Sequence, residues 1–324
     1  MDNSLRMSLQ AFDSLKQHLS QQIIGQSALV ENLLIALLAD GHLIVEGPPG
    51  LAKTRAINAL AKGIEADFHR IQFTPDLLPA DLTGTDIYRP EDGTFTFQAG
   101  PLFRNLVLAD EINRAPAKVQ SALLEAMGEG QVTVGRKTYE LPDLFLVMAT
   151  QNPIEQEGTY PLPEAQLDRF LMHLEIDYPD AASELEILKL NRGEALKHEA
   201  EKIEAISQKD IFTARDEVLS IHMAPAVEAY IVDLIIATRT PEKYDATLAK
   251  WLGFGASPRA TIALDRCARA RAWLHARDFV SPEDVQAVFH NALRHRILLT
   301  YQAEAEGINA NQVLDHILSL VAVG

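Results

Sequence analysis

A short turn rich in glycine and proline follows the apolar run 43–45 and ends in a lysine and a threonine. Its residues, with the arginine after them, are Gly47, Pro48, Pro49, Gly50, Leu51, Ala52, Lys53, Thr54 and Arg55. Backbone N–H groups of such a turn converge on an anion, and the following helix adds the partial positive charge of its N-terminus. A lysine here reaches terminal phosphates, and a threonine hydroxyl can ligate Mg²⁺. The turn therefore predicts a site for a nucleoside triphosphate with Mg²⁺; the alternative is a plain Pro/Gly connection between a strand and a helix.

Position 52 departs from the usual pattern of this turn, which has glycine there. We expect Ala52 to begin the helix, where alanine is the better helix former. On that expectation, the departure leaves the phosphate site intact.

A second group of polar residues follows the apolar run 106–109. The adjacent acids Asp110 and Glu111 come directly after this run. Ligands of open parallel sheets bind at the carboxyl ends of the strands. Both carboxylates should therefore face the turn at residues 47–54, the phosphate turn. We expect Asp110 to hold Mg²⁺ through water and Glu111 to act as the base on the water that attacks the γ-phosphate.

A third strand end supplies an amide to the same edge. Residues 144–149 are apolar and are followed by Thr150, Gln151 and Asn152. We expect Asn152 to orient the attacking water. Three such strand ends rarely coincide by chance, which strengthens the prediction made from the turn alone.

Charge and cysteine content limit the partners and the compartment. The 324 residues carry a net charge of −16, which opposes general binding to nucleic acid or anionic membranes. The single cysteine, Cys267, excludes an internal disulfide and fits a reducing cytoplasm. The first residues do not resemble a secretion signal, and no long uncharged apolar run predicts a membrane span. We therefore expect a cytoplasmic protein.

Strand and helix patterns alternate through the first half of the chain. Two helices are expected between residues 4 and 40, and others after the phosphate turn, after Pro116 and near Glu164. Strands are expected at 42–46, 68–73, 105–110, 144–149 and 170–176. Strands that alternate with helices form a parallel sheet covered on both faces. Residues 1–178 are therefore predicted to form an α/β nucleotide-binding domain around a parallel five-stranded sheet.

Two β-hairpins interrupt this alternation. Residues 74–104 are too long for a simple connection, and they contain Asp92-Gly93 between alternating aromatic residues. Residues 131–139 alternate in the same way around Gly135. Such hairpins fit two roles: moving parts that project from the sheet, or covers for its edges.

The sequence changes character after residue 178. Residues 181–191 have helical spacing and the rest of 179–208 is mixed and polar, which predicts a linker or hinge. From 209 to 324 the apolar residues recur at helical spacing throughout. The second domain is therefore predicted to be all-α.

Taken together, these features resemble the AAA+ ATPases, and the hairpins and motif details narrow the resemblance to the MoxR family. The similarity extends over nearly the whole chain. The segments that carry it are 50–54 (GLAKT), 109–116 (ADEINRAP), 149–153 (ATQNP), 164–170 (EAQLDRF) and 255–259 (GASPR). The resemblance implies a P-loop core that hydrolyses ATP with Mg²⁺ and a C-terminal helical lid. It also identifies the hairpin near 74–104 as an insertion in the second helix, and the hairpin near 131–141 as the one that precedes the first sensor.

The resemblance further implies a homo-oligomeric ring, usually a hexamer, with ATP at each subunit boundary. Arg169 then corresponds to the arginine finger that reaches the neighbour's nucleotide. Arg259, which follows the helix-capping pair Ser257-Pro258, corresponds to the second sensor, and its action on its own or a neighbour's nucleotide stays open. Ile24 and Gly25 correspond to the stretch that closes over adenine. Without the resemblance, a salt bridge on the surface explains each arginine equally well.

Three functions fit these features. The MoxR resemblance implies an ATP-driven, chaperone-like machine that remodels, assembles or metallates a partner protein complex. A nucleic-acid-dependent ATPase or helicase shares both hairpins, but the net charge and the lack of an added DNA-binding domain oppose it. A metal-chelatase-type motor subunit has a closely similar architecture. A client with a von Willebrand factor A domain would suit the first and third functions, and the sequence does not name it.

Overall fold

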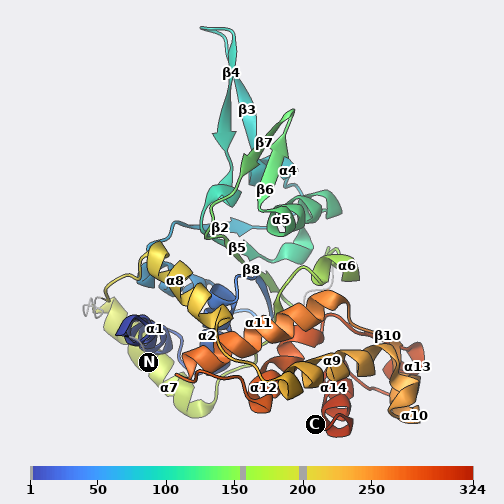
Figure 1. The fold of residues 1–324 in the computed structure, drawn as a ribbon. Coiled ribbons are helices and arrows are strands. Elements are labelled where there is room, and N and C mark those ends of the chain that lie inside the picture. The colour runs from blue at the N-terminus through green and yellow to red at the C-terminus, as the bar shows by residue number, and fades with distance from the viewer. Residues whose placement is uncertain (1–2, 154–157, 197–202, 324) are drawn as a thin grey trace.

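The computed structural model describes residues 3–153, 158–196 and 203–323, and its centre is a five-stranded parallel sheet (Figure 1). The strand order is β2-β5-β8-β1-β9, and every neighbouring pair is parallel, as the sequence predicts. The strands are β1 (Leu43–Glu46), β2 (Phe68–Gln72), β5 (Leu106–Asp110), β8 (Leu146–Gln151) and β9 (Met172–Glu175).

The register of the sheet brings the predicted strand ends to one edge. Glu46 of β1 lies opposite Gln151 of β8, and Ala109 of β5 lies opposite Ala149. The strands β1, β5 and β8 are buried along nearly their whole length, which explains their unbroken apolar sequences. Because the strands run in the same direction, the polar residues that follow them meet at the carboxyl edge.

Helices pack on both faces of the sheet. Alternate residues of β5 enter separate apolar clusters: Leu106 and Leu108 pack with the first three helices, and Val107 and Ala109 pack with α5. The helices of this part are α1 (Asn3–Gln22), α2 (Ser27–Leu38), α3 (Lys53–Gly63), α4 (Pro79–Thr83), α5 (Ala117–Glu129) and α6 (Glu164–Leu167). Short 3₁₀ turns are η1 (Pro101–Phe103) and η2 (Ile112–Arg114).

Both predicted hairpins are present and project from the sheet on the same side (Figure 1). The first consists of β3 (Gly84–Arg89) and β4 (Thr94–Ala99), and the second of β6 (Gln131–Val134) and β7 (Lys137–Glu140). Phe97 of the first hairpin stacks on Tyr139 of the second, with ring centroids 3.9 Å apart. Aromatic stacking therefore holds the hairpins together near their bases.

The C-terminal domain is helical, with one small exception. Its helices are α8 (Gln208–Leu219), α9 (Pro225–Arg239), α10 (Ala246–Trp251), α11 (Pro258–Leu274), α12 (Pro282–Leu293), α13 (Tyr301–Ala305) and α14 (Ala310–Leu320), with the 3₁₀ turn η3 (Pro241–Lys243). A short antiparallel ribbon joins β10 (Leu252–Phe254) to β11 (Leu298–Leu299). The expectation of helices alone therefore misses this ribbon, which is too short to show period-two alternation in the sequence.

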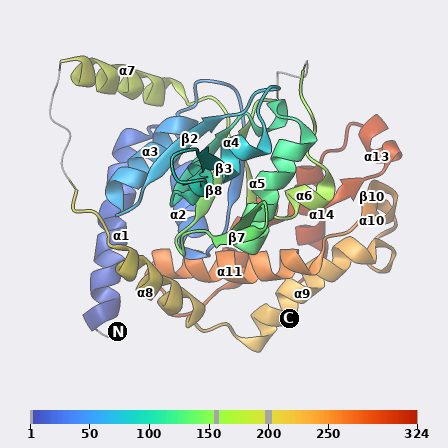
Figure 2. The ribbon, with the colours of Figure 1, turned by 90° about the horizontal axis from the view of Figure 1, so that it is seen from above.

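The segment 179–208 contains one long helix, α7 (Ala181–Ala195), that buries none of its residues (Figure 2). Residues 197–202 of the expected linker lie outside the described residues. The first helices and the C-terminal helices share one apolar core, in which the rings of Phe12 and Trp273 meet edge to face at 5.2 Å. We keep 1–178, 179–208 and 209–324 as proposed domain boundaries. None of the described helices combines the length and apolar composition needed to cross a membrane.

Candidate nucleotide-binding site

The phosphate turn links β1 to α3 through two residues in the left-handed region. Gly50 has φ +85° and Ala52 has φ +57°. The helix begins at Lys53, and Ala52 is the residue before it. The expectation that Ala52 begins the helix is therefore wrong: alanine stands in a conformation that glycine adopts more easily.

Tight packing fixes the start of the turn. A Cβ on Gly47 would lie 2.5 Å from the carbonyl oxygen of Ile176, so only glycine fits there. The Gly47 N–H donates to the carbonyl oxygen of Gln151 at 3.3 Å. The turn is thereby tied to both strands that flank β1.

Lys53 faces the ends of β1 and β8. Its Nζ donates to the carbonyl oxygens of Gly47 at 2.5 Å and of Gln151 at 3.3 Å. Burial lowers the pKa of Lys53, and the nearby charges of Asp110, Glu46 and Glu111 oppose that shift. The ammonium group thus lies within electrostatic reach of the acids at the ends of β1 and β5.

Thr150 binds the two acids that the sequence singles out. Its hydroxyl donates to Asp110 Oδ1 at 2.6 Å and accepts from the Glu111 backbone N–H at 2.9 Å. Asp110 Oδ2 also pairs with Arg70 at 2.6 Å. This bridging role of Thr150 is absent from the sequence predictions, although a hydroxyl residue at the end of a neighbouring strand was a signal that could have indicated it.

Glu111 adopts an uncommon backbone conformation at the strand end. Its φ of +55° is left-handed, which is uncommon for a residue with a side chain and occurs often at functional sites. Its carboxylate accepts from Gln72 Nε2 at 2.8 Å and pairs with Arg114 Nε at 3.0 Å. The carboxylate is therefore oriented by two donors and stays partly exposed.

The oxygen donors near Lys53 fit a magnesium ion. Mg²⁺ prefers oxygen ligands, and the Asp110 carboxylate and the Thr54 hydroxyl are of that type. Thr54 lies in the first turn of α3, and Asp110 ends β5, within electrostatic reach of Lys53. Asn152 follows β8 at the same edge and is buried.

A histidine contact behind the phosphate turn is absent from the sequence predictions. His173 of β9 lies 3.0 Å from the Glu46 carboxylate at the end of β1. The hydrogen bond from His173 lowers the pKa of Glu46. The sequence offers little indication of this contact, because Glu46 and His173 are far apart in the sequence and meet only because β1 and β9 are neighbours in the sheet.

Two predicted nucleotide contacts have different surroundings. Gly25 lies against Pro179 and Ser183, and Gly47 lies against Ile176, so the same chain segment after β9 packs on both glycines. The Arg55 guanidinium instead pairs with Glu194 of α7 and donates to Gln22 at 2.8 Å. The terminal nitrogens of Arg55 are therefore engaged by α7 and α1, while its buried Nε has no hydrogen-bond partner among the described residues. A nucleotide contact of Arg55 stays a prediction.

Arg169 and Arg259 come together in one cavity. It has a volume of about 230 Å³, and its charged lining residues are four arginines and two acids: Arg169, Arg259, Arg266, Arg296, Asp40 and Asp168. Arg169 donates to the backbone carbonyl of Leu124, and neither Arg169 nor Arg259 pairs with an acid in the described part of the chain. No residue of the phosphate turn lines this cavity, and α3 and α6 lie on opposite sides of the sheet (Figure 2).

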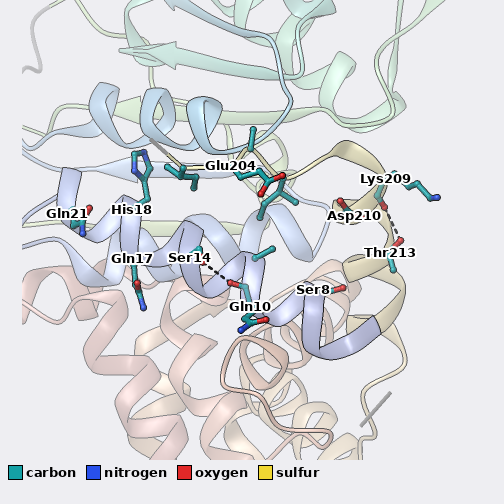
Figure 3. A pocket seen from close by; sticks show the side chains of 14 residues that line it. Ser8, Gln10, Ser14, Gln17, His18, Gln21, Glu204, Lys209, Asp210 and Thr213 are labelled. Atoms are coloured by element: carbon teal, nitrogen blue, oxygen red, sulfur yellow. Dashed lines mark hydrogen bonds between the residues drawn. The ribbon is translucent and has the colours of Figure 1, made fainter. Parts of the chain in front are cut away.

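A second cavity, of about 930 Å³, lies between α1 and the start of α8 (Figure 3). Its Ser14 and Thr213 hydroxyls each donate at 3.0 Å to a carbonyl one turn earlier in their own helix. None of the predicted site residues lines it. These two hydroxyl groups are therefore satisfied within their own helices, and the Ser8 hydroxyl donates to Glu217 of α8 at 3.3 Å.

Comparisons with known proteins bear on the family and the fold of this chain. Residues 42–172 match the family described as "ATPase family associated with various cellular activities (AAA)", and residues 249–317 match the AAA lid domain. Chaperone MoxR1 of Mycobacterium tuberculosis (strain ATCC 25618 / H37Rv) is 46% identical over 302 residues, which cover 93% of this chain and 79% of that protein. Protein MoxR of Methylorubrum extorquens is 34% identical over 298 residues, covering 88% and 86%. A solved structure from Cytophaga hutchinsonii, provisionally assigned as an ATPase, has a TM-score of 0.91 and 46% identity, covering 99% and 97%.

Proposed function

We propose that this chain, which belongs to the MoxR family of AAA+ ATPases, hydrolyses ATP with Mg²⁺ at the carboxyl edge of its sheet and uses the energy to remodel a protein client. One observation carries the proposal. Lys53 Nζ donates to the carbonyl oxygens of Gly47 and Gln151 at the carboxyl edge of the sheet, and Asp110 ends β5 at that edge. A magnesium-bound triphosphate needs a cation and an acid at one such edge.

Each strand end has a proposed part in hydrolysis. The phosphate turn, residues 47–54, surrounds the phosphates with backbone N–H groups, and Lys53 adds a point charge. Thr54 and Asp110 would hold Mg²⁺, which would neutralise phosphate charge when bound. Glu111 activates the attacking water, and Asn152 orients it.

We propose that residues of a neighbouring subunit complete the ATP site. Arg169 and Arg259 share a cavity, lack acidic partners in the described residues and lie away from their own phosphate turn. Arginines without an acidic partner can bind an anion that another molecule supplies. A homo-oligomeric ring, with six subunits as the proposed number, brings this cavity to the next subunit's γ-phosphate, so both arginines act in trans.

The client is proposed to be a protein complex that this ATPase assembles or metallates. The mycobacterial relative is named a chaperone, which supports that class of activity. A von Willebrand factor A-domain protein is the proposed partner class, and a cytoplasmic location fits the free, buried Cys267. The net charge of −16 disfavours nucleic acid as the client.

Replacement of Glu111 by glutamine tests the hydrolytic role. Glu111→Gln keeps the size of the side chain and removes the base, so ATP binding should persist while turnover falls at least about 10²-fold. Isothermal titration would measure binding, and phosphate release would measure turnover. Glu304→Gln, on exposed α13, is the control and should behave like the unmodified protein. Unchanged turnover in Glu111→Gln would place the base elsewhere.

The same variant offers a route to the client. A Glu111→Gln protein that retains ATP should also retain the client, so affinity capture from the native cell extract should enrich it over the Glu304→Gln control. Enrichment of a metal-insertion complex would favour the chelatase-type alternative over a chaperone role.

A further inference from the structure

Asp168 precedes Arg169 in the turn between α6 and β9, and it contacts the C-terminal domain at two points. Its Oδ2 accepts a hydrogen bond from Ser257 Oγ at 2.8 Å, and its Oδ1 accepts one from Arg296 Nε at 2.8 Å. Ser257 caps α11, and its Oγ accepts from the Arg259 backbone N–H at 3.1 Å. One carboxylate therefore joins the turn that carries Arg169 to the helix start that carries Arg259.

Arg296 uses its remaining donors on the same turn. Its Nη2 donates to the carbonyl oxygen of Phe170 at 2.6 Å, and its Nη1 donates to that of Leu171 at 3.0 Å. The Arg296 side chain is 3% exposed, and that of Asp168 is 19% exposed. A planar guanidinium that binds several acceptors at once fixes their relative positions. The turn before β9 is thus held rigidly against the C-terminal end of α12.

The charge of Asp168 is directed at Arg296 and not at the two arginines that act on phosphate in our proposal. Arg169 lies instead over α5, where its Nη1 is 3.0 Å from the point that a Cβ on Gly128 would occupy. Arg259 is exposed and lines the same cavity as Arg169. Asp168 lines this cavity too, but its two carboxylate oxygens are hydrogen-bonded to Ser257 and Arg296. It can therefore set the positions of both cations without forming an ion pair with either.

We propose that Asp168 is a positioning residue that holds Arg169 and Arg259 at a fixed spacing through Arg296 and Ser257. The two arginines then meet the phosphates of a neighbouring subunit as one rigid unit, although they belong to different domains of the chain. This inference rests on the proposed function, in which both arginines act across the subunit boundary. Asp168 itself touches no nucleotide.

Replacement of Asp168 should separate catalysis from ATP binding. A misplacement of about 1 Å can reduce a rate about 10²-fold, so Asp168→Ala should lower kcat about 10- to 100-fold. Its ATP dissociation constant should stay within about twofold of the unmodified value, because its own phosphate turn is untouched. Asp168→Asn keeps one carboxamide oxygen as an acceptor and should lose less activity. Asp265→Ala, which removes an ion pair with Arg269 elsewhere on α11, is the control and should keep normal kcat.

Mixed rings distinguish positioning from general damage. An Asp168→Ala subunit has an intact phosphate turn, and a Lys53→Ala neighbour has intact arginines, so the mixture should recover activity that neither variant has alone. Native mass measurement would confirm co-assembly, and thermal melting would confirm folding; if Asp168→Ala does not fold, Asp168→Asn is judged by the same criteria.

Two results would overturn the inference. One is a normal kcat in folded Asp168→Ala, or in Asp168→Asn where Asp168→Ala does not fold. The other is a lowered kcat that co-assembled Lys53→Ala subunits do not rescue. A parallel mixture of Arg169→Ala with Lys53→Ala separates the two proposals. If that mixture recovers activity and the Asp168→Ala mixture does not, only the positioning role is wrong; if neither recovers, the trans action of the proposed function is wrong.

Discussion

At the scale of single residues, the left-handed conformations of Ala52 and Glu111 show where the backbone is constrained around the phosphate turn. Both stand at the carboxyl edge of the sheet, one before α3 and the other after β5. Local conformations of this kind persist only where the surrounding structure enforces them. Here the surroundings are the backbone hydrogen bonds of the turn and the hydroxyl of Thr150.

Replacement of Ala52 by glycine should stabilise the protein. A left-handed residue with a Cβ costs about 1 kcal/mol more than glycine, so Ala52→Gly should raise the free energy of unfolding by up to about that amount. ATP binding should be retained. Ala61→Gly, within α3, is the matched control and should lose roughly 1 kcal/mol, because glycine is a poor residue in a helix interior. Urea denaturation would measure the free energy of unfolding of both variants. A lower value in Ala52→Gly than in the unmodified protein would contradict the prediction.

Ala52 also shows what the sequence could and could not predict at this scale. The composition of the turn was sufficient to predict a phosphate-binding segment, but the φ angle of one residue depends on how the turn closes on Gln151 and Ile176. The roles of Thr150 and His173 depend in the same way on strand order. Contacts between distant segments are not encoded in any local pattern.

At the scale of elements, His42 links the start of β1 to its neighbours. Its Nδ1 accepts from the Val147 backbone N–H of β8 at 3.0 Å, and its Nε2 lies 3.3 Å from the carbonyl oxygen of Met127 in α5. A neutral ring with the proton on Nε2 satisfies both contacts. Burial lowers the pKa of His42 to about 4, with smaller opposing contributions from the Met127 carbonyl and Asp40.

The lowered pKa of His42 predicts that the free energy of unfolding falls as the pH drops. The unfolded chain binds a proton at His42 near pH 6.5 and the folded chain only near pH 4, so protonation favours unfolding between these values. Stability is fully present above pH 6.5 and should fall by roughly 3 kcal/mol as the pH drops to 4. His42→Asn should be less stable at pH 7.5 but lose less stability on acidification. His69→Asn, on exposed β2, is the control; a His42→Asn profile parallel to the control would exclude this contribution.

The elements themselves were largely predictable from the sequence. The five strands and both hairpins were predicted because apolar runs and Asp-Gly or Gly turns mark them in the sequence. The ribbon of β10 and β11 was not, because its strands contain three and two residues and pair across more than forty intervening residues. Short pairings of this kind are set by tertiary packing rather than by local propensity.

At the scale of the whole molecule, the fold and the MoxR family assignment are confirmed. The proposed ring would join two regions of the molecule: the phosphate turn with the acidic strand ends, and the cavity that holds Arg169 and Arg259. The sequence could indicate Arg169 and Arg259 only through the family resemblance. Their common cavity depends on the packing of α11 and α12 against the turn before β9, where Arg296 binds Asp168.

The most direct test of the account is the activity of mixed rings built from two inactive variants. Lys53→Ala removes the charge proposed to engage the phosphates, and Arg169→Ala removes the proposed trans-acting cation, which can contribute about 10³- to 10⁵-fold to the rate. Each variant alone should hydrolyse ATP very slowly, and Arg169→Ala should still bind ATP. Co-assembled mixtures should recover part of the activity, because some boundaries combine an intact phosphate turn with an intact arginine. Mixtures that co-assemble by native mass measurement and stay as inactive as either variant would contradict the account.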